Sequence, residues 1–171
     1  PLRVFGVKRQ KIPGVEFAGE VAAVGKSVTH FAVGDQVFGT TTGLRKGANA
    51  EYVCVPENPK QGVLAAMPTT ANFDEAAALP VGGMTALFLL EKANIQAGDE
   101  VLVHGASGSV GSYAVQLAKA AFDARVTGVC STRNVELVQS LGAEKVIDYT
   151  EEDISQSGQT YDVVFDAVGK L

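Results

Sequence analysis

Residues 101–111 read Val101-Leu-Val-His-Gly-Ala-Ser-Gly-Ser-Val-Gly111. Gly105, Gly108 and Gly111 recur at every third position between an apolar run that predicts a buried strand and a segment with helical spacing. Glycine lets a backbone turn sharply and approach a pyrophosphate closely, while the free N–H groups at a helix start supply a positive end. We therefore predict a dinucleotide-binding loop, of variant spacing because the usual first glycine would fall at Ala106.

The segments on both sides of this loop alternate between strand and helix. Apolar runs predict the strands, and apolar residues at helical spacing predict the helices between them. Such alternation is typical of βαβ units on a parallel sheet. The second half of the chain is therefore predicted to be α/β, a partial doubly wound parallel sheet. The expected strands are 100–104, 125–130, 145–149 and 161–166, and the expected helices are 109–122 and 135–141.

Two further helices are expected before this alternation begins. Asn72 or Asp74 is a suitable N-cap for a short helix over 75–79. Pro80 is expected to end that helix because proline lacks the N–H that a helix interior uses. The next helix is expected over 83–94.

The first part of the chain has a different pattern. Short apolar stretches separated by glycine turns predict strands at 15–24, 36–38 and 51–55. Several short strands at close spacing are typical of an antiparallel barrel or sandwich. The proline-containing residues 56–71 are interpreted as an irregular connection. An antiparallel β unit is therefore predicted to precede the parallel sheet.

Charge argues against nucleic acid as a partner. The 171 residues carry 14 Lys and Arg against 19 Asp and Glu, a formal net charge of −5, whereas a duplex-binding domain usually has a basic field. One local exception is a basic cluster near the start, for which a solvated segment is favoured over a binding patch. Its members are Arg3, Lys8, Arg9 and Lys11.

Cysteine usage and hydropathy favour a cytoplasmic protein. Cys54 and Cys130 stand far apart, without the tight paired spacing of a secreted chain. No signal-peptide pattern opens the sequence. The longest uncharged run, Ala76 to Leu90, is fifteen residues and contains Pro80, which is short for a membrane span. No membrane association is therefore expected.

The residues after the second predicted strand indicate which dinucleotide is bound. An acidic side chain there would accept from the ribose of NAD, whereas basic or hydroxyl groups suit the extra phosphate of NADP. The sequence reads Cys130-Ser131-Thr132-Arg133-Asn134, with no carboxylate before Glu136. We therefore predict NADP(H), bound partly by Ser131, Thr132 and Arg133. The alternative is that Ser131 caps the next helix and Arg133 is a solvated surface residue.

Several linked motifs resemble one enzyme superfamily over residues 12–169. Besides the glycine loop and the segment from Leu141 to Tyr149, they read Pro13-Gly14-Val-Glu-Phe-Ala-Gly19-Glu-Val, Gly34-Asp35-Gln-Val-Phe-Gly39, Ala48-Asn-Ala-Glu-Tyr-Val and Ala76-Ala-Ala-Leu-Pro80. The chain is similar to the medium-chain dehydrogenase/reductase superfamily and, within it, to the zinc-free quinone oxidoreductases related to zeta-crystallin. The resemblance implies a GroES-like catalytic and substrate domain over 1–75 and a Rossmann NADP-binding domain over 76–171, both incomplete at their outer ends.

The resemblance also implies positions for cofactor-binding residues. Thr85, Val168 and Gly169 would lie near the nicotinamide, and Tyr149 near the adenosine phosphate. Helix packing is the alternative for Thr85, and a strand-end aromatic role is the alternative for Tyr149. No catalytic proton donor is assigned. The loop residues expected at the cofactor are Gly105, Ser107, Gly108, Ser109, Val110 and Gly111.

No metal is expected. A catalytic zinc needs three protein ligands. Zinc-dependent relatives carry a histidine where Val15 stands and a cysteine in the region 81–83, where this chain has no ligand type. Glu16, His30 and His104 remain as possible ligands, but turn or strand-end roles are favoured for them.

Family resemblance implies hydride transfer from NADPH to a quinone or an α,β-unsaturated carbonyl. The alternatives are another zinc-free NADP-dependent reductase, acting on an enoyl thioester or an aldehyde, and a non-enzymatic cofactor-binding protein of the crystallin kind. The chain is shorter than such enzymes, so we expect a fragment that is inactive by itself. The longer form is expected to be a homodimer.

Overall fold

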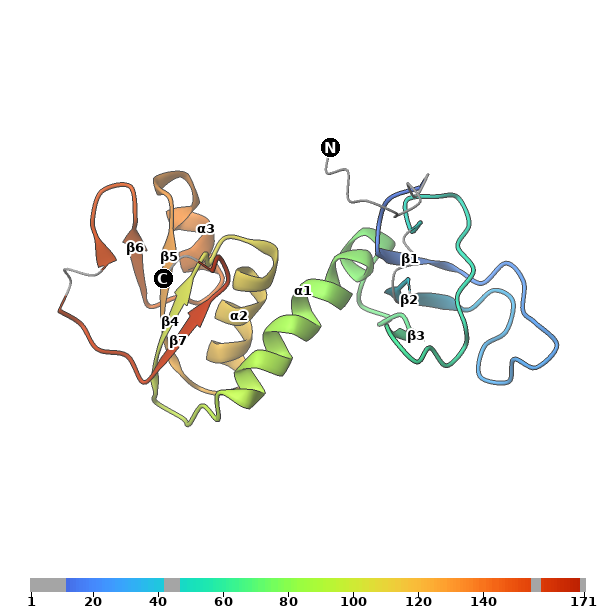
Figure 1. The fold of residues 1–171 in the computed structure, drawn as a ribbon, viewed down its shortest axis with the longest axis horizontal. Coiled ribbons are helices and arrows are strands. Elements are labelled where there is room, and N and C mark those ends of the chain that lie inside the picture. The colour runs from blue at the N-terminus through green and yellow to red at the C-terminus, as the bar shows by residue number, and fades with distance from the viewer. Residues whose placement is uncertain (1–11, 42–46, 155–157, 170–171) are drawn as a thin grey trace, which may run out of the picture. The chain divides into compact units, whose positions relative to one another are not determined.

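The structure is a computed structural model that describes residues 12–41, 47–154 and 158–169. The four basic residues near the start of the chain (Arg3, Lys8, Arg9 and Lys11) lie outside the described residues. Contacts within the chain divide it into two compact units, Pro1–Val81 and Gly82–Leu171. Their elements are labelled in Figure 1. The predicted domain boundary between residues 75 and 76 stays a prediction.

The first unit holds an antiparallel sheet. Its strands are β1 (Glu16–Glu20), β2 (Gln36–Thr40) and β3 (Leu64–Ala66), in the order β1-β2-β3. Gly39 of the central strand β2 lets the residue before β3 approach closely, because a Cβ on Gly39 would overlap the Val63 carbonyl oxygen. The predicted antiparallel class is confirmed, since β2 pairs in this way with both β1 and β3.

Three details of that prediction are wrong. The strand expected over 15–24 ends at Glu20. The expected strand over 51–55 is not a strand in the structure, and β3 lies inside the segment interpreted as an irregular connection. The short β3 depends on its pairing with β2, in which Leu64 is the partner of Gly39. Cross-strand packing of this kind is decided by tertiary neighbours rather than by the intrinsic preference of the segment.

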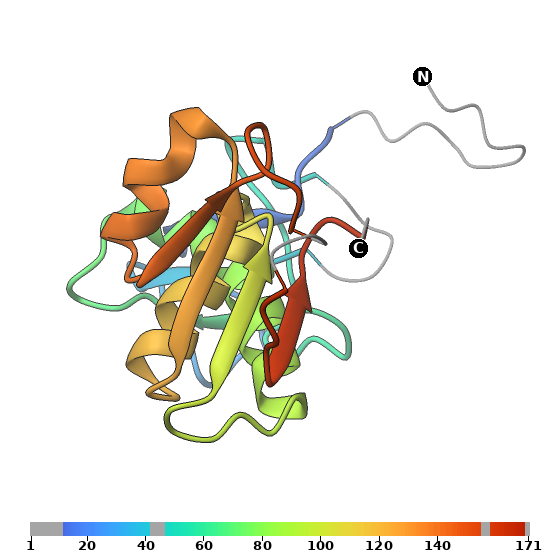
Figure 2. The ribbon, with the colours of Figure 1, turned by 90° about the vertical axis from the view of Figure 1, so that its left-hand side faces the viewer.

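The second unit holds a parallel sheet in the order β6-β5-β4-β7 (Figure 2). The predicted α/β class and all four predicted strands are confirmed, although β6 and β7 are shorter than expected. The strands are β4 (Glu100–His104), β5 (Arg125–Cys130), β6 (Lys145–Asp148) and β7 (Val163–Asp166).

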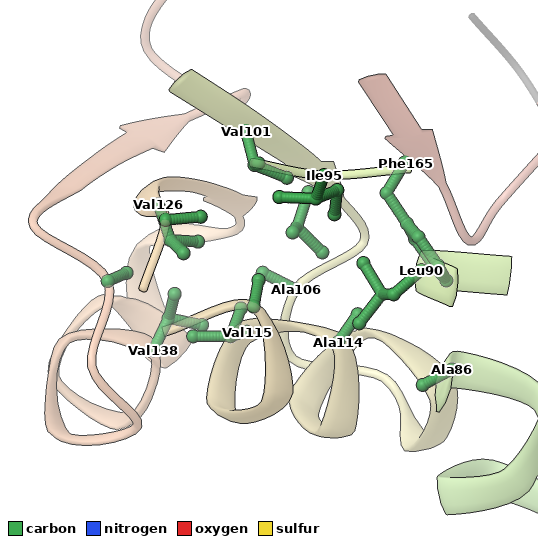
Figure 3. Close-up of a cluster of buried hydrophobic side chains, with 14 of the residues drawn as sticks. Ala86, Leu90, Ile95, Val101, Ala106, Ala114, Val115, Val126, Val138 and Phe165 are labelled. Carbon is green, nitrogen blue, oxygen red and sulfur yellow. The ribbon is translucent and has the colours of Figure 1, made fainter. Parts of the chain in front are cut away.

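Helices cover one face of this sheet. They are α2 (Ser109–Ala120) and α3 (Val135–Ser140), the latter preceded by the 3-10 turn η1 (Thr132–Asn134). Alternate strand residues meet them in the core drawn in Figure 3. Gly128 brings α3 against the sheet, because a Cβ there would overlap the Val138 side chain. Buried core members from sheet and helices include Val101, Val103, Ala114, Val115, Val126, Val138 and Phe165.

The opposite face of the sheet carries a smaller cluster. Leu102, Val129 and Ile147 are buried there, with Ile154 and Tyr161 packed against them. Strand side chains alternate between faces, so Val164 of β7 also belongs to this side, and 53% of it is exposed.

A single helix, α1 (Phe73–Lys92), replaces the two helices predicted around Pro80. Asn72 caps it as predicted: Asn72 Oδ1 accepts from Glu75 N, and Glu75 Oε2 accepts from Asn72 N, both at 2.9 Å. Pro80 lies within the helix, and the next amide, Val81 N, donates to Glu16 Oε1 at 2.6 Å. The predicted break at Pro80 is therefore wrong.

The continuous α1 also changes the hydropathy argument. At 20 residues, α1 is long and apolar enough, by length and composition, to cross a membrane. Of its apolar 18-residue stretch, 28% is buried within the protein. The expectation of no membrane association relied on a short run interrupted at Pro80. That reasoning no longer holds, and the expectation stays a prediction.

Candidate nucleotide-binding site

The glycine loop turns sharply at the carboxyl end of β4. Gly105 has a φ of +78°, a left-handed conformation that glycine adopts without steric cost. Gly105 N and Ala106 N both donate to Val129 O of β5, at 3.1 and 3.0 Å, and Gly108 N donates back to Gly105 O at 2.9 Å. These bonds hold the loop against two neighbouring strands and fix its direction toward α2.

Gly108 and Gly111 lack side chains for different reasons. A Cβ on Gly111 would overlap the Gly105 carbonyl oxygen, so the first turn of α2 packs directly on the loop backbone. A Cβ on Gly108 would meet, within 4 Å among the described residues, the Gly105 carbonyl oxygen at 3.3 Å. Gly111 therefore serves helix packing, and Gly108 leaves the surface of the loop open.

The first amide groups of α2 have no carbonyl partner within the helix itself. Ser112 N donates to Gly108 O at 2.8 Å, so the amides of Ser109, Val110 and Gly111 precede the first intrahelical bond. Gly108 is the N-cap residue, and no side-chain capping bond occurs among the described residues. Backbone N–H groups and the helix dipole together favour an anion such as a pyrophosphate at this end.

A pocket of about 1120 Å³ lies next to this loop. It exceeds the roughly 300–1,000 Å³ usual for small-molecule sites, which suits an extended ligand such as a dinucleotide. The loop, the end of β5, the segment after β6 and the turn after β7 all contribute. The lining residues are His104, Gly105, Ser107, Gly108, Ser109, Val110, Gly111, Cys130, Tyr149, Thr150, Glu151, Glu152, Asp153, Ile154, Ala167 and Val168.

The structure brings together most of the predicted cofactor residues. All six loop residues line the pocket, as do Tyr149 and Val168. Four predicted residues are not among the lining residues of the described chain: the exposed Thr85 of α1, and Ser131, Thr132 and Arg133 after β5. Their cofactor-binding roles stay predictions. Gly169 follows Val168 with a φ of +74°.

Ser131 and its neighbours follow β5 and are tied to the glycine loop. Asn134 Nδ2 donates to Ser107 Oγ at 3.0 Å and to Ser131 Oγ at 3.3 Å. Ser131 is the N-cap residue of η1 but makes no side-chain capping bond among the described residues. Thr132 and Arg133 are exposed, so their polar groups can reach a phosphate in solvent.

A hydroxyl network joins the ends of β5 and β6. Thr150 Oγ1 donates to Asp148 Oδ1 at 2.7 Å, and its amide donates to the same oxygen at 2.9 Å. The Thr132 and Thr150 hydroxyls lie 2.9 Å apart. Hydrogen bonds from Thr132 and then Thr150 hold the pKa of Asp148 below its usual value. The network orders the segment that carries Tyr149, which is 56% exposed.

Sequence reasoning missed several lining residues. Cys130 is buried, and burial raises the pKa of its thiol. His104 ends β4 beside the glycine loop, so its predicted strand-end place is confirmed, but its pairing was missed: it lines the pocket and its Nδ1 lies 2.9 Å from Asp166 Oδ1. Its position directly before the first loop glycine was the available signal. Asp166 is 62 residues away, so the pairing depends on strand register that the sequence does not display.

The candidate metal ligands are engaged elsewhere. Glu16 accepts from Val81 N, and His104 pairs with Asp166. His30 Nδ1 lies 3.2 Å from Glu57 Oε1. Within the described ranges, no group of three or more His, Cys, Asp or Glu side chains comes together in a way that would hold a metal ion. The expectation that no metal binds stays a prediction.

The first unit contains a separate cavity of about 610 Å³. Residues of the antiparallel sheet line it, including Phe17, Val37 and Leu64, together with Cys54. This mostly apolar lining resembles small-molecule sites in general.

Comparisons with known families match both units. Residues 3–68 match the family described as "Alcohol dehydrogenase GroES-like domain", and residues 109–171 match "Zinc-binding dehydrogenase". The chain is 41% identical over 166 residues to a 2-methylene-furan-3-one reductase of Solanum lycopersicum, covering 93% of this chain and 42% of that protein.

Solved structures agree with these matches. The quinone oxidoreductase from Coxiella burnetii is 37% identical with a TM-score of 0.83, covering 92% of this chain and 49% of that one. An Escherichia coli quinone oxidoreductase complexed with NADPH is 32% identical with a TM-score of 0.67, covering 82% of this chain and 42% of that one.

The matches settle the family but concern proteins of greater length. The chain spans about half the length of the curated relative and of the solved structures described above. The predicted GroES-like and Rossmann-type classes are confirmed by the family models and by the two sheets. The chain belongs to the medium-chain dehydrogenase/reductase superfamily and, within it, to the quinone oxidoreductase branch.

Proposed function

We propose that the protein containing this chain is an NADPH-dependent oxidoreductase that transfers a hydride to a quinone or an α,β-unsaturated carbonyl without a metal. The glycine loop carries the proposal, because the exposed Gly108 and the first amides of α2, which no side chain of the described residues caps, form a cradle for a pyrophosphate. The names of its relatives support the substrate class: 2-methylene-furan-3-one is an unsaturated ketone, and the two solved structures are quinone oxidoreductases.

NADP(H) is the dinucleotide that fits the end of β5. A 2′-phosphate needs donors, and Ser131, Thr132 and Arg133 provide two hydroxyls and a guanidinium. The relative solved with NADPH supports the same choice. Along the chain, the segment that follows β5 carries no carboxylate before Glu136.

When bound, NADPH supplies the hydride, and this chain's residues bind and orient it. The amides of Ser109, Val110 and Gly111 hold the pyrophosphate, and the groups after β5 hold the adenosine phosphate. The turn at Val168 borders the remaining length of the pocket. Binding at several points fixes the reactive ring relative to an acceptor, which lowers the entropic part of the barrier.

The activity is tested by following NADPH oxidation with the full-length protein that contains this chain. The panel contains quinones, enones, enoyl thioesters and aldehydes, each with and without a metal chelator. We expect turnover of quinones or enones that the chelator leaves unchanged. Turnover of enoyl thioesters or aldehydes alone would reassign the substrate, and NADPH binding without turnover of any acceptor would make the protein a non-enzymatic cofactor binder.

Two further expectations belong to this proposal. We propose that the full-length protein is a cytoplasmic homodimer and that the 171-residue chain alone binds the dinucleotide without catalysing the reaction. Sedimentation equilibrium tests the dimer, fractionation tests the location, and the same NADPH oxidation assay on the 171-residue chain tests the last point.

A further inference from the structure

Strands β4 and β7 end side by side, and a side-chain pair joins their carboxyl ends. His104 and Asp166 are register partners in the parallel pairing of these strands. His104 Nδ1 lies 2.9 Å from Asp166 Oδ1, and the side chains are 14% and 24% exposed. The two side chains are therefore partly shielded from solvent, although Asp166 as a residue is exposed.

The same carboxylate oxygen orders the turn that follows β7. Asp166 Oδ1 accepts from Val168 N at 2.9 Å and from Gly169 N at 3.0 Å. Ala167 N donates to the His104 carbonyl oxygen at 3.0 Å. His104 thus holds residues 167–169 in two ways. Its carbonyl oxygen accepts directly from Ala167 N, and its side chain pairs with Asp166, which accepts from the next two amides.

This turn lies against the glycine loop. A Cβ on Gly105 would lie 2.6 Å from Val168 Cγ2, so Val168 packs on the first loop glycine. Gly105, Ala167 and Val168 all line the same pocket. A shift of the turn would therefore change the wall of the pocket beside the phosphate loop.

The sheet order indicates which part of the ligand meets this turn. In the order β6-β5-β4-β7, the groups proposed for the adenosine phosphate follow β5, on one side of β4. The turn follows β7, on the other side of β4. A dinucleotide whose pyrophosphate lies at the loop after β4 crosses between these sides, so its nicotinamide half lies at residues 167–169.

We propose that His104 and Asp166 are positioning residues that hold residues 167–169 in place for the nicotinamide half of NADPH. This inference depends on the proposed function. A turn that is already ordered does not lose entropy when the ligand binds, so the pair increases affinity without a contact of its own. The effect is confined to the half of the ligand that the turn meets.

Two ligands separate this role from general stabilisation. NADPH occupies both halves of the pocket, whereas adenosine 2′,5′-bisphosphate occupies the adenosine half alone. Calorimetric titration of the purified protein with each ligand is compared for wild type, Asp166→Ala, His104→Ala and His104→Asn. The asparagine amide restores a donor near the place of Nδ1 and tests rescue.

The matched control is Asp162→Ala. Asp162 lies near the opposite end of β7, and its Oδ2 accepts from Glu100 N at 2.8 Å, so it also joins β7 to β4. Loss of Asp162 removes a comparable link between the strands at a distance from the pocket. Any uniform effect of weaker strand pairing would appear in this variant as well.

We expect Asp166→Ala and His104→Ala to weaken NADPH binding about tenfold, because the loosened turn must then be ordered when the ligand binds. In both variants the affinity for adenosine 2′,5′-bisphosphate should stay within about twofold of wild type. His104→Asn should recover most of the NADPH affinity. Asp162→Ala should leave the affinity for both ligands unchanged. If Asp166→Ala does not fold, His104→Ala decides.

Equal weakening of both ligands, or unchanged NADPH affinity in His104→Ala, would overturn the positioning role and leave the proposed function intact. A wild-type protein that binds neither ligand would overturn the proposed function and, with it, this inference. The two failures are therefore distinguishable within the same set of titrations.

Discussion

The Gly111 α-carbon faces the Gly105 carbonyl oxygen so closely that a Cβ on Gly111 would overlap that oxygen. The loop after β4 and the first turn of α2 are therefore one packed unit. Gly108 lies between them, exposed and facing the pocket. The two glycines consequently serve different purposes, and substitution separates stability from binding.

Gly111→Ala should destabilise the fold. The added methyl would overlap a backbone atom that cannot rotate away, and overpacking of this kind costs about 1–3 kcal/mol. Denaturant unfolding of the two proteins measures the difference. Gly108→Ala is the matched comparison: its methyl would meet Gly105 O at 3.3 Å, a tight contact but not an overlap, so the free energy of unfolding should fall less than in Gly111→Ala while NADPH binding weakens. Equal stability of both variants would contradict the packing role of Gly111.

Arg133→Ala should lower the affinity for NADPH and leave that for NADH unchanged. The guanidinium is proposed to pair with the 2′-phosphate, which NADH lacks, and its loss should cost about tenfold in affinity. Fluorescence titration with both dinucleotides measures the effect. Arg125→Ala is the control, because Arg125 lies at the opposite end of β5, where its Nη2 pairs with Glu100 Oε1 at 2.9 Å. Equal weakening of NADH binding in Arg133→Ala would contradict this assignment.

Asp148 should make the second unit less stable as the pH falls into the acidic range. The Thr132 and Thr150 hydroxyls lower the pKa of Asp148 from its usual value of 3.8. A pKa that is lower in the folded state gives a stabilisation that is fully present above pH 3.8 and is lost as the pH falls through the folded-state pKa. Asp148→Asn should therefore lower the melting temperature at neutral pH, and the deficit should shrink below pH 3.8.

Thr150→Val provides a second comparison for the same network. It removes one hydroxyl donor to Asp148 Oδ1 and should show the same pH dependence with a smaller amplitude. A deficit in melting temperature that stays constant from neutral to acidic pH, in both variants, would show that the Asp148 charge is not the cause.

Asn72→Ala should destabilise the start of α1. Asn72 and Glu75 satisfy each other's amides, both at 2.9 Å, and loss of such a cap costs about 1 kcal/mol. Thermal unfolding measures the difference. The control is Asn58→Ala, since Asn58 is exposed and lies outside any helix or strand. An unchanged melting temperature in Asn72→Ala would mean that tertiary packing, rather than the cap, holds this end.

The sequence predicts the region around the glycine loop well. The strands β4 and β5 begin and end at the predicted residues, because unbroken apolar runs bounded by glycine, charge and hydroxyl residues leave few alternatives. The phosphate cradle follows from the same local pattern. Here backbone preference, apolar periodicity and turn residues all agree, which is the condition under which local reasoning succeeds.

Pro80 shows where local reasoning fails. Its missing N–H predicts a helix end, yet α1 continues through it, and the following Val81 amide meets the Glu16 carboxylate, 65 residues away. The pair of His104 and Asp166 depends likewise on the register of two strands 62 residues apart. Contacts between such distant residues are a property of the assembled sheet and helices, and no local pattern displays them.

Calorimetric titration of the 171-residue chain with NADPH and NADH tests most directly whether the glycine loop binds NADP(H). We predict a single NADPH site with an affinity about tenfold higher than that for NADH, as a charge-assisted phosphate contact would give. Absence of NADPH binding by the folded chain, or equal affinity for the two dinucleotides, would contradict the assignment.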